Sequence, residues 1–171
     1  MAITTLNNRS INRSDTGAAD QLWTLTSATA TDFQAAAAGG KILQVLTART
    51  ETRVDIATTT YTDVGLSIAI TPAATSSKIY AMWTMQANQD ASRGYGCKLL
   101  RDTTAVFTSP DLTAVYSTVN SFRLRGTFWY LDSPSSTSEI TYKVQVATNG
   151  GSQVEFQETN GSDLMIMEVG G

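Results

Sequence analysis

The side chains of this sequence that could do chemistry are carboxylates, and two pairs stand out. Asp55 with Asp63, and Glu155 with Glu158, could supply the two acids that a glycoside hydrolase places on either side of its substrate bond. Carboxylates beside strands are usually solvated or paired with Lys and Arg. We therefore expect neither pair to be catalytic.

The sequence contains no histidine and a single cysteine. Histidine is the commonest general base, the usual partner that activates a serine, and the commonest imidazole metal ligand. Without a histidine nearby, nothing obvious lowers the pKa of Cys97 or accepts its proton, so we expect a buried structural thiol. The sequence predicts no catalytic residue, no cofactor and no metal, and hence a protein that is not an enzyme.

Two further patterns resemble binding loops only superficially. Asp102 and Asp111 are predicted in loops but lack the dense Asp, Asn and Gly spacing of a calcium loop, which favours turn capping. The glycine-rich segment 93–96 lacks the lysine and the strand-to-helix context of a phosphate loop. We expect a bend or bulge there.

Charge and hydropathy exclude two classes of partner. The net charge is −3 and the pI is near 4.8, whereas nucleic-acid binding normally needs a basic face. The longest apolar runs are too short to span a bilayer, and the first residues lack the blocks of a signal peptide. We expect a soluble chain that is made in the cytoplasm, with no nucleic-acid partner and no membrane insertion.

Alternation of apolar and polar side chains predicts many short strands. In 62–71, for example, Val64, Leu66, Ile68 and Ile70 alternate with small or polar residues, which is typical of a half-buried strand. Turn residues separate each strand from the next. The other predicted strands are 21–26, 41–50, 53–60, 78–87, 94–99, 105–107, 121–131, 139–148, 154–156 and 163–169, with a hairpin turn at 100–104.

This pattern predicts an all-β fold, a single antiparallel β-sandwich or jelly-roll domain, because two packed sheets can bury the inner faces of so many strands. We place the domain at residues 21–171. Residues 1–20 are polar and are predicted to be an extended N-terminal arm.

Two interpretations of the arm compete: a disordered tail, or a segment that orders against a neighbouring subunit. We expect docking on a neighbour, because carboxamides can complete a sheet edge, arginines can pair with acids, and isolated apolar residues can fill small pockets. The residues predicted to make these contacts are Leu6, Asn8, Arg9, Ile11, Asn12 and Arg13.

Two predicted strands carry large apolar side chains on both faces. Tyr80, Met82, Trp129 and Leu131 fall on the nominally outer faces, which predicts an oligomer interface and a homotrimer. Alternatively, the loop 109–120 covers these side chains within one chain. Trp129 also shares its strand face with arginines, so a glycan platform is a further interpretation.

Several segments of the sequence resemble virion structural proteins of marine tailed phages. The resemblance covers most of the chain and specifies a fold more than a chemical site. It implies a threefold oligomer by analogy of fold, and no catalytic residue to carry over. The resembling segments are 10–16, 22–24, 30–34, 40–45, 63–72, 76–79, 142–145 and 164–169.

The resemblance leaves three hypotheses. We expect a capsid decoration or cement protein, which binds the outer shell as an oligomer and stabilises it. Its partner is expected to be the major capsid protein or another virion protein, which the arm contacts. The alternative is a tail-fibre or receptor-binding head that contacts host surface glycans, although the sequence shows no shaft. An enzyme that acts on host polysaccharide is the weakest hypothesis. In the first two cases the protein resides in the virion.

Overall fold

The computed structural model divides the chain into two compact units, residues 1–38 and 39–171. It describes residues 21–27, 30–35, 40–89, 93–119, 122–150, 153–158 and 160–171, with side chains from Gly40 onward except that of Phe122. In the first unit β1 (Gln21–Ser27) and β2 (Ala30–Ala35) form an antiparallel two-stranded sheet. The predicted arm lies outside the described residues, so the boundary at residue 20 stays a prediction.

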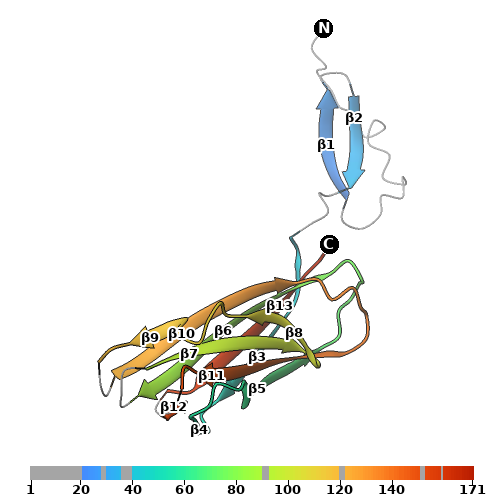
Figure 1. Ribbon diagram of the computed structural model, residues 1–171. Coiled ribbons are helices and arrows are strands. Elements are labelled where there is room, and N and C mark those ends of the chain that lie inside the picture. Colours follow the sequence, from blue (N-terminus) through green and yellow to red (C-terminus); the bar gives the residue numbers. More distant parts are fainter. Residues whose placement is uncertain are drawn as a thin grey trace. The chain divides into compact units, whose positions relative to one another are not determined.

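The second unit is built from strands alone among its described residues, as the alternation predicts (Figure 1). Two expectations need correction. The predicted strand 53–60 is paired only over Val54–Ile56, and segment 93–96 is regular strand with no bend or bulge. The strands are β3 (Ile42–Thr50), β4 (Val54–Ile56), β5 (Thr62–Ile70), β6 (Lys78–Gln89), β7 (Arg93–Arg101), β8 (Thr104–Thr108), β9 (Val115–Ser117), β10 (Phe122–Asp132), β11 (Ile140–Thr148), β12 (Val154–Phe156) and β13 (Ser162–Val169).

The strand order makes this unit a jelly roll. One antiparallel sheet has the order β3-β13-β6-β10, with β12 and β4 continuing beside the far end of β6. The other has the order β5-β11-β7-β8, with β9 also on β7. Successive long strands alternate between the two sheets, which is how a jelly roll closes without leaving the inner faces exposed. The all-β sandwich predicted from the sequence is confirmed.

The core consists of the inward side chains of both sheets. All four inward residues predicted in 62–71 are buried, as are the inward side chains of β6, β7, β11 and β13. Trp83 lies near the centre and its ring packs against Phe107 and Phe128 at centroid distances of 5.4 and 5.7 Å. Period-two burial of this kind is the main source of stability, because each strand removes one complete row of apolar side chains from water.

Tyr95 joins the two sheets at their centre. Its hydroxyl donates to the Met85 carbonyl at 2.9 Å and accepts from the Gly126 amide at 3.1 Å. A Cβ at Gly126 would lie 2.7 Å from that hydroxyl oxygen and 2.5 Å from Cγ2 of Val115. Glycine is therefore required here by the close approach of the facing sheet.

Candidate functional site

The outer face of the β3-β13-β6-β10 sheet carries two rows of apolar side chains. The first row crosses all four strands, and the second crosses β13, β6 and β10. Register places Met167 and Leu131 on either side of Tyr80, and Met165 and Trp129 on either side of Met82. Val45 extends the first row onto β3. We call this surface the apolar face, and it consists of Val45, Tyr80, Met82, Trp129, Leu131, Met165 and Met167.

These side chains are substantially open to water. Trp129 is 63% exposed, Val45 50% and Leu131 45%, while the methionines and Tyr80 are half-buried. The rings of Tyr80 and Trp129 stack at 6.1 Å with an interplanar angle of 21°. An exposed apolar patch that spans four strands and contains an aromatic pair is typical of a protein interface.

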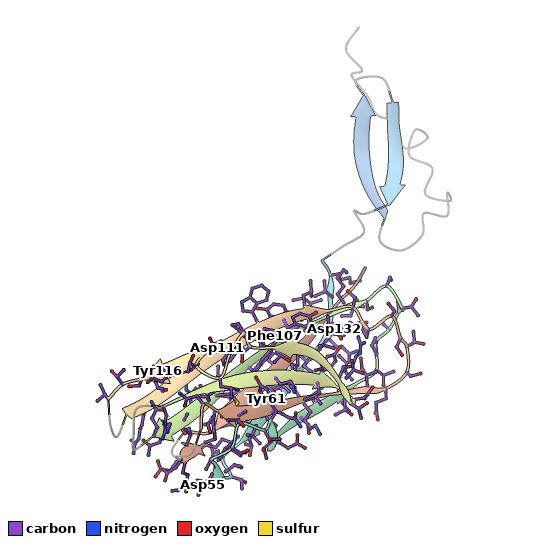
Figure 2. All side chains as sticks on the ribbon, viewed as in Figure 1. Asp55, Tyr61, Phe107, Asp111, Tyr116 and Asp132 are labelled. Carbon is purple, nitrogen blue, oxygen red and sulfur yellow. The ribbon has the colours of Figure 1, made fainter. Side chains whose placement is uncertain are left out.

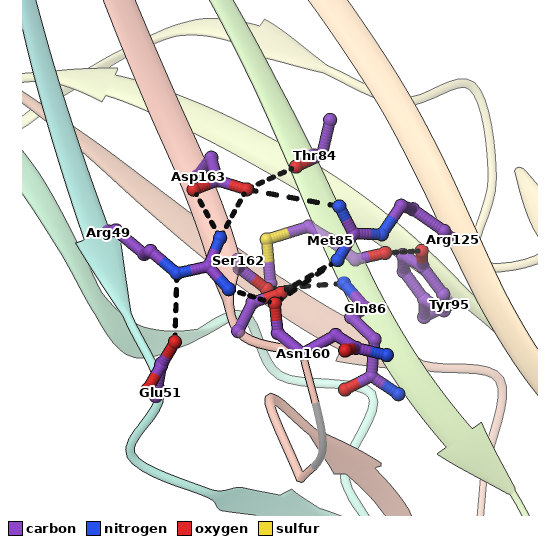
Figure 3. Close-up of polar contacts among 11 residues, drawn as sticks. Arg49, Glu51, Thr84, Met85, Gln86, Tyr95, Arg125, Asn160, Ser162 and Asp163 are labelled. Atoms are coloured by element: carbon purple, nitrogen blue, oxygen red, sulfur yellow. Dashed lines mark hydrogen bonds and ion pairs between the residues drawn. The ribbon is translucent and has the colours of Figure 1, made fainter.

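A polar network bounds the apolar face on one side. Arg49 of β3 donates to Asp163 of β13 at 2.9 Å, and Thr84 of β6 reaches the same carboxylate at 3.3 Å (Figure 3). Arg49 and Arg125 both donate to the Asn160 carbonyl. The network ties four strands together at the level where the apolar rows stop, so the patch has a defined polar rim.

The outer face of the other sheet has a different character. Asp63 accepts hydrogen bonds from Lys143 at 2.9 Å and Gln145 at 2.7 Å, and Lys98 lies 4.2 Å from the ring centroid of Tyr61. Such a surface is well solvated. The contrast makes the apolar face a feature of one sheet, with no counterpart on the β5-β11-β7 surface.

A hollow of about 600 Å³ runs along the edge of β10. Phe107, which lines it, is labelled in Figure 2. Five consecutive residues of β10, from Thr127 to Leu131, line it together with Phe107 of β8. Phe107 also packs against Phe128 and Tyr130 at 6.4 and 6.0 Å. An apolar hollow therefore opens where the edges of the two sheets meet.

The predicted interface residues thus share one surface, and the predicted arm residues lie outside the described part of the chain. Both roles stay predictions. Among described residues 109–119, the loop approaches β10 at Gly126 through Val115 and leaves Trp129 and Leu131 exposed. Met165, Met167 and Val45 were missed. The alternation in 163–169 already separates the two methionines from Leu164 and Ile166, so it predicts their outward direction but not which strands lie beside them.

The carboxylates considered for catalysis are held by cations. Arg53 bonds both Asp55, at 2.7 Å, and Glu155, and its guanidinium lies 3.8 Å from Glu158. Asp63 is paired with Lys143, as described above. Each candidate is therefore part of an ion pair, in agreement with the interpretation that such carboxylates are structural.

Two turn aspartates cap the chain as expected. Asp102, at a positive φ of 53°, accepts from the Thr141 amide at 2.9 Å. Asp111 accepts from both the amide and the hydroxyl of Thr113, at 2.7 and 2.8 Å. One carboxylate oxygen of each aspartate is engaged by the protein itself. No cluster of three metal-ligating side chains occurs in the described residues.

Cys97 is completely buried, as predicted, and burial raises the pKa of its thiol. A thiol that stays protonated is a poor nucleophile. The part of the chain that the structure describes contains no helix that could serve as a membrane span.

No family model matches the sequence. No curated protein matches it either. Among solved structures, that of the Gx strain of infectious bursal disease virus is similar, with a TM-score of 0.47 and 12% identity over 85% of this chain and 35% of that one. The VP2 subviral particle of infectious bursal disease virus has a TM-score of 0.45 and 10% identity over 85% of this chain and 43% of that one.

Dimeric latent PorU from Porphyromonas gingivalis is similar at a lower level, with a TM-score of 0.35 and 8% identity over 79% of this chain and 14% of that one. This chain therefore spans less than half the length of each of these three proteins. At such scores the likenesses carry no information about function.

Proposed function

We propose that this protein is a non-enzymatic structural protein of a tailed-phage virion, which decorates the outer shell as an oligomer and stabilises it. The observation that carries the proposal is the one-sided apolar face. A chain that leaves Trp129 63% exposed beside half-buried methionines is built to be covered by another protein surface. The resemblance of segments such as 63–72 and 164–169 to virion structural proteins supports the same assignment.

The stabilising action follows from burial at the contact. Covering the apolar face removes its side chains from water, and each square ångström of apolar surface buried contributes about 25 cal/mol. A decoration protein that bridges neighbouring shell subunits then resists their separation. The predicted arm adds contacts through Arg9, Arg13 and Ile11, each of which is weak, so several arms in one oligomer are needed for firm attachment.

A second function is supported by one observation. Trp129 stacks on Tyr80 and exposes its ring, an arrangement that can pack against the apolar face of a sugar. This favours a tail-fibre or receptor-binding head that contacts host glycans. The two functions differ in where the protein lies on the particle.

Quantitative mass spectrometry of purified virions tests the proposal. A copy number that matches the shell protein supports decoration, and a copy number that matches tail proteins supports the fibre. Absence of the protein from virions contradicts both.

The variant Trp129→Ser, with Lys143→Ser on the polar outer face as its control, tests the surface itself. The first change should reduce the occupancy of particles that lack the wild-type protein, and the second should not. Deletion of residues 2–19 should also reduce occupancy. Full occupancy after that deletion would place the attachment site wholly within residues 20–171.

A further inference from the structure

We infer that the free edge of β10 pairs with β10 of a second copy of this chain, antiparallel and across a twofold axis at Trp129. The inference rests on the geometry of one edge strand. It holds whether or not the protein belongs to a virion, so its test is independent of the proposed function.

β10 differs from the other sheet edges among the described residues in being long and regular. Eleven consecutive residues pair with β6 without a register shift. By contrast, the pairings of the edge strands β3, β5 and β8 each contain a register shift, and β4 has three residues. Bulges and short strands protect sheet edges from strand addition. β10 has neither protection.

The same edge lacks charge over its exposed part. From Gly126 to Leu131 the side chains are glycine, threonine, phenylalanine, tryptophan, tyrosine and leucine. Charged side chains and proline are the other devices that keep edges apart. Arg125 precedes this stretch and Asp132 follows it, so six consecutive residues of the edge are uncharged, and Thr127, Trp129 and Leu131 among them are exposed.

Hydrogen bonds to Gln86 show which backbone groups of β10 are free. The Gln86 amide donates to Ser162 at 3.2 Å, and its carbonyl accepts from the Gln157 amide at 3.0 Å, so Gln86 directs its backbone away from β10. Backbone direction alternates along a strand. The backbone amides and carbonyls of odd-numbered β6 residues such as Met85 therefore point toward β10.

The partners of Met85, Trp83 and Ala81 in β10 are Gly126, Phe128 and Tyr130. The amides and carbonyls of the intervening residues, Thr127, Trp129 and Leu131, consequently point to the free edge. Within the described residues, no other backbone group bonds to these three. These unpaired amides and carbonyls can form a ladder of hydrogen bonds with another strand.

A second copy fits this ladder because the segment is complementary to itself. With Trp129 on the twofold axis, Trp129 faces its counterpart and Thr127 faces Leu131 of the other copy. Arg125 then faces Ser133, so no like charges oppose each other. The pairing joins the two apolar faces side by side into one surface, in which Trp129 of each copy packs against that of the other and Leu131 packs against Thr127.

The axis makes the contact isologous, which predicts a dimer and not the homotrimer expected from the sequence. Sedimentation equilibrium of the full-length protein should give twice the chain mass of 18.3 kDa. A monomer or a three-chain mass would overturn the inference.

The variant Thr127→Pro tests the edge itself. Because the Thr127 amide points to solvent in one chain, proline removes no bond within the monomer but removes a rung of the dimer ladder. We expect an unchanged circular dichroism spectrum and a monomer mass. The control Thr127→Ala keeps the amide and should remain dimeric.

Thr127→Lys provides a second variant should proline disturb the strand. The Thr127 side chain is exposed, so lysine is tolerated by the fold, while it places a charge opposite Leu131 of the other copy. It should also give a monomer. A folded dimer in either variant would contradict pairing through β10.

Discussion

The hydroxyl of Tyr142 donates a 2.6 Å hydrogen bond to Asp132, and this contact joins the two sheets at the end of the sandwich. Arg101 holds the same carboxylate oxygen at 2.8 Å. Burial, and then the bond to Asp132, raise the pKa of Tyr142 well above its ordinary value. A buried carboxylate is thus balanced by one cation and one neutral donor.

Removal of the Tyr142 hydroxyl should therefore destabilise the fold. Tyr142→Phe keeps the ring and deletes the donor, and loss of a hydrogen bond to a charged group costs about 1.5–3 kcal/mol. The free energy of unfolding, measured by urea denaturation, checks this. Tyr80→Phe is the matched control because its ring lies on the half-buried outer face, and its effect should be negligible. Equal losses of unfolding free energy in the two variants would show that the hydrogen bond to Asp132 does not stabilise the fold.

Gly126→Ala should destabilise the protein because the new methyl group meets Val115 and the Tyr95 hydroxyl. Overpacking of this kind costs about 1–3 kcal/mol. The double variant Gly126→Ala with Val115→Ala removes one of the two clashing groups. Its loss in unfolding free energy should be smaller than the sum of the single losses. Strict additivity would show that Val115 does not limit the space at Gly126.

Glu168 should make stability depend on acid pH. Burial alone would raise the pKa of this carboxyl, but the neighbouring Ser77 hydroxyl and the hydrogen bonds from Gln44 and the Ala73 amide outweigh burial and lower it. A depressed pKa in the folded state stabilises the protein above the unfolded pKa, and this stabilisation disappears as the pH falls through the folded pKa.

The unfolding free energy of the wild type should therefore fall more steeply than that of Glu168→Gln once the pH drops below about 4.5, the ordinary glutamate value. Urea denaturation at a series of pH values measures this difference. Asp63→Asn, at an exposed carboxylate, is the comparison. It should reduce the pH dependence of the unfolding free energy less than Glu168→Gln does. Parallel profiles for the wild type and Glu168→Gln would contradict the assignment.

Truncation of the two tryptophans at neighbouring levels of the sheet should reduce the unfolding free energy by very different amounts. Trp83 is 1% exposed, so Trp83→Ala should cost about 3–5 kcal/mol. Trp129 is largely exposed and packs mainly on Tyr80, so Trp129→Ala should cost about 1 kcal/mol or less in a dissociated chain. Denaturation at concentrations where the chain is monomeric separates folding from association. A large loss for Trp129→Ala there would mean that the ring supports the fold.

The local sequence pattern was sufficient to predict where most strands lie and which of their side chains point inward. Val64, Leu66 and Trp83 are buried as the alternation predicts, because the period of two depends on neighbouring residues alone. Arg53–Thr60 shows where the rule fails. Only Val54–Ile56 pairs as a strand, with β12, while the Thr58 carbonyl accepts a hydrogen bond from the Thr148 amide. A segment continues as a strand only where a neighbouring strand satisfies its backbone.

Composition and alternation by themselves determined the all-β class, the buried Cys97, and the outward direction of Tyr80 and Trp129. Tertiary structure alone decided that Met165 and Met167 of the last strand join Tyr80 and Trp129, and that β10 lies at an edge. Side-chain direction is a local property of the chain, whereas strand order and register depend on pairing between segments far apart in sequence. The extent of the apolar face and the free ladder of β10 therefore could not be derived from the sequence.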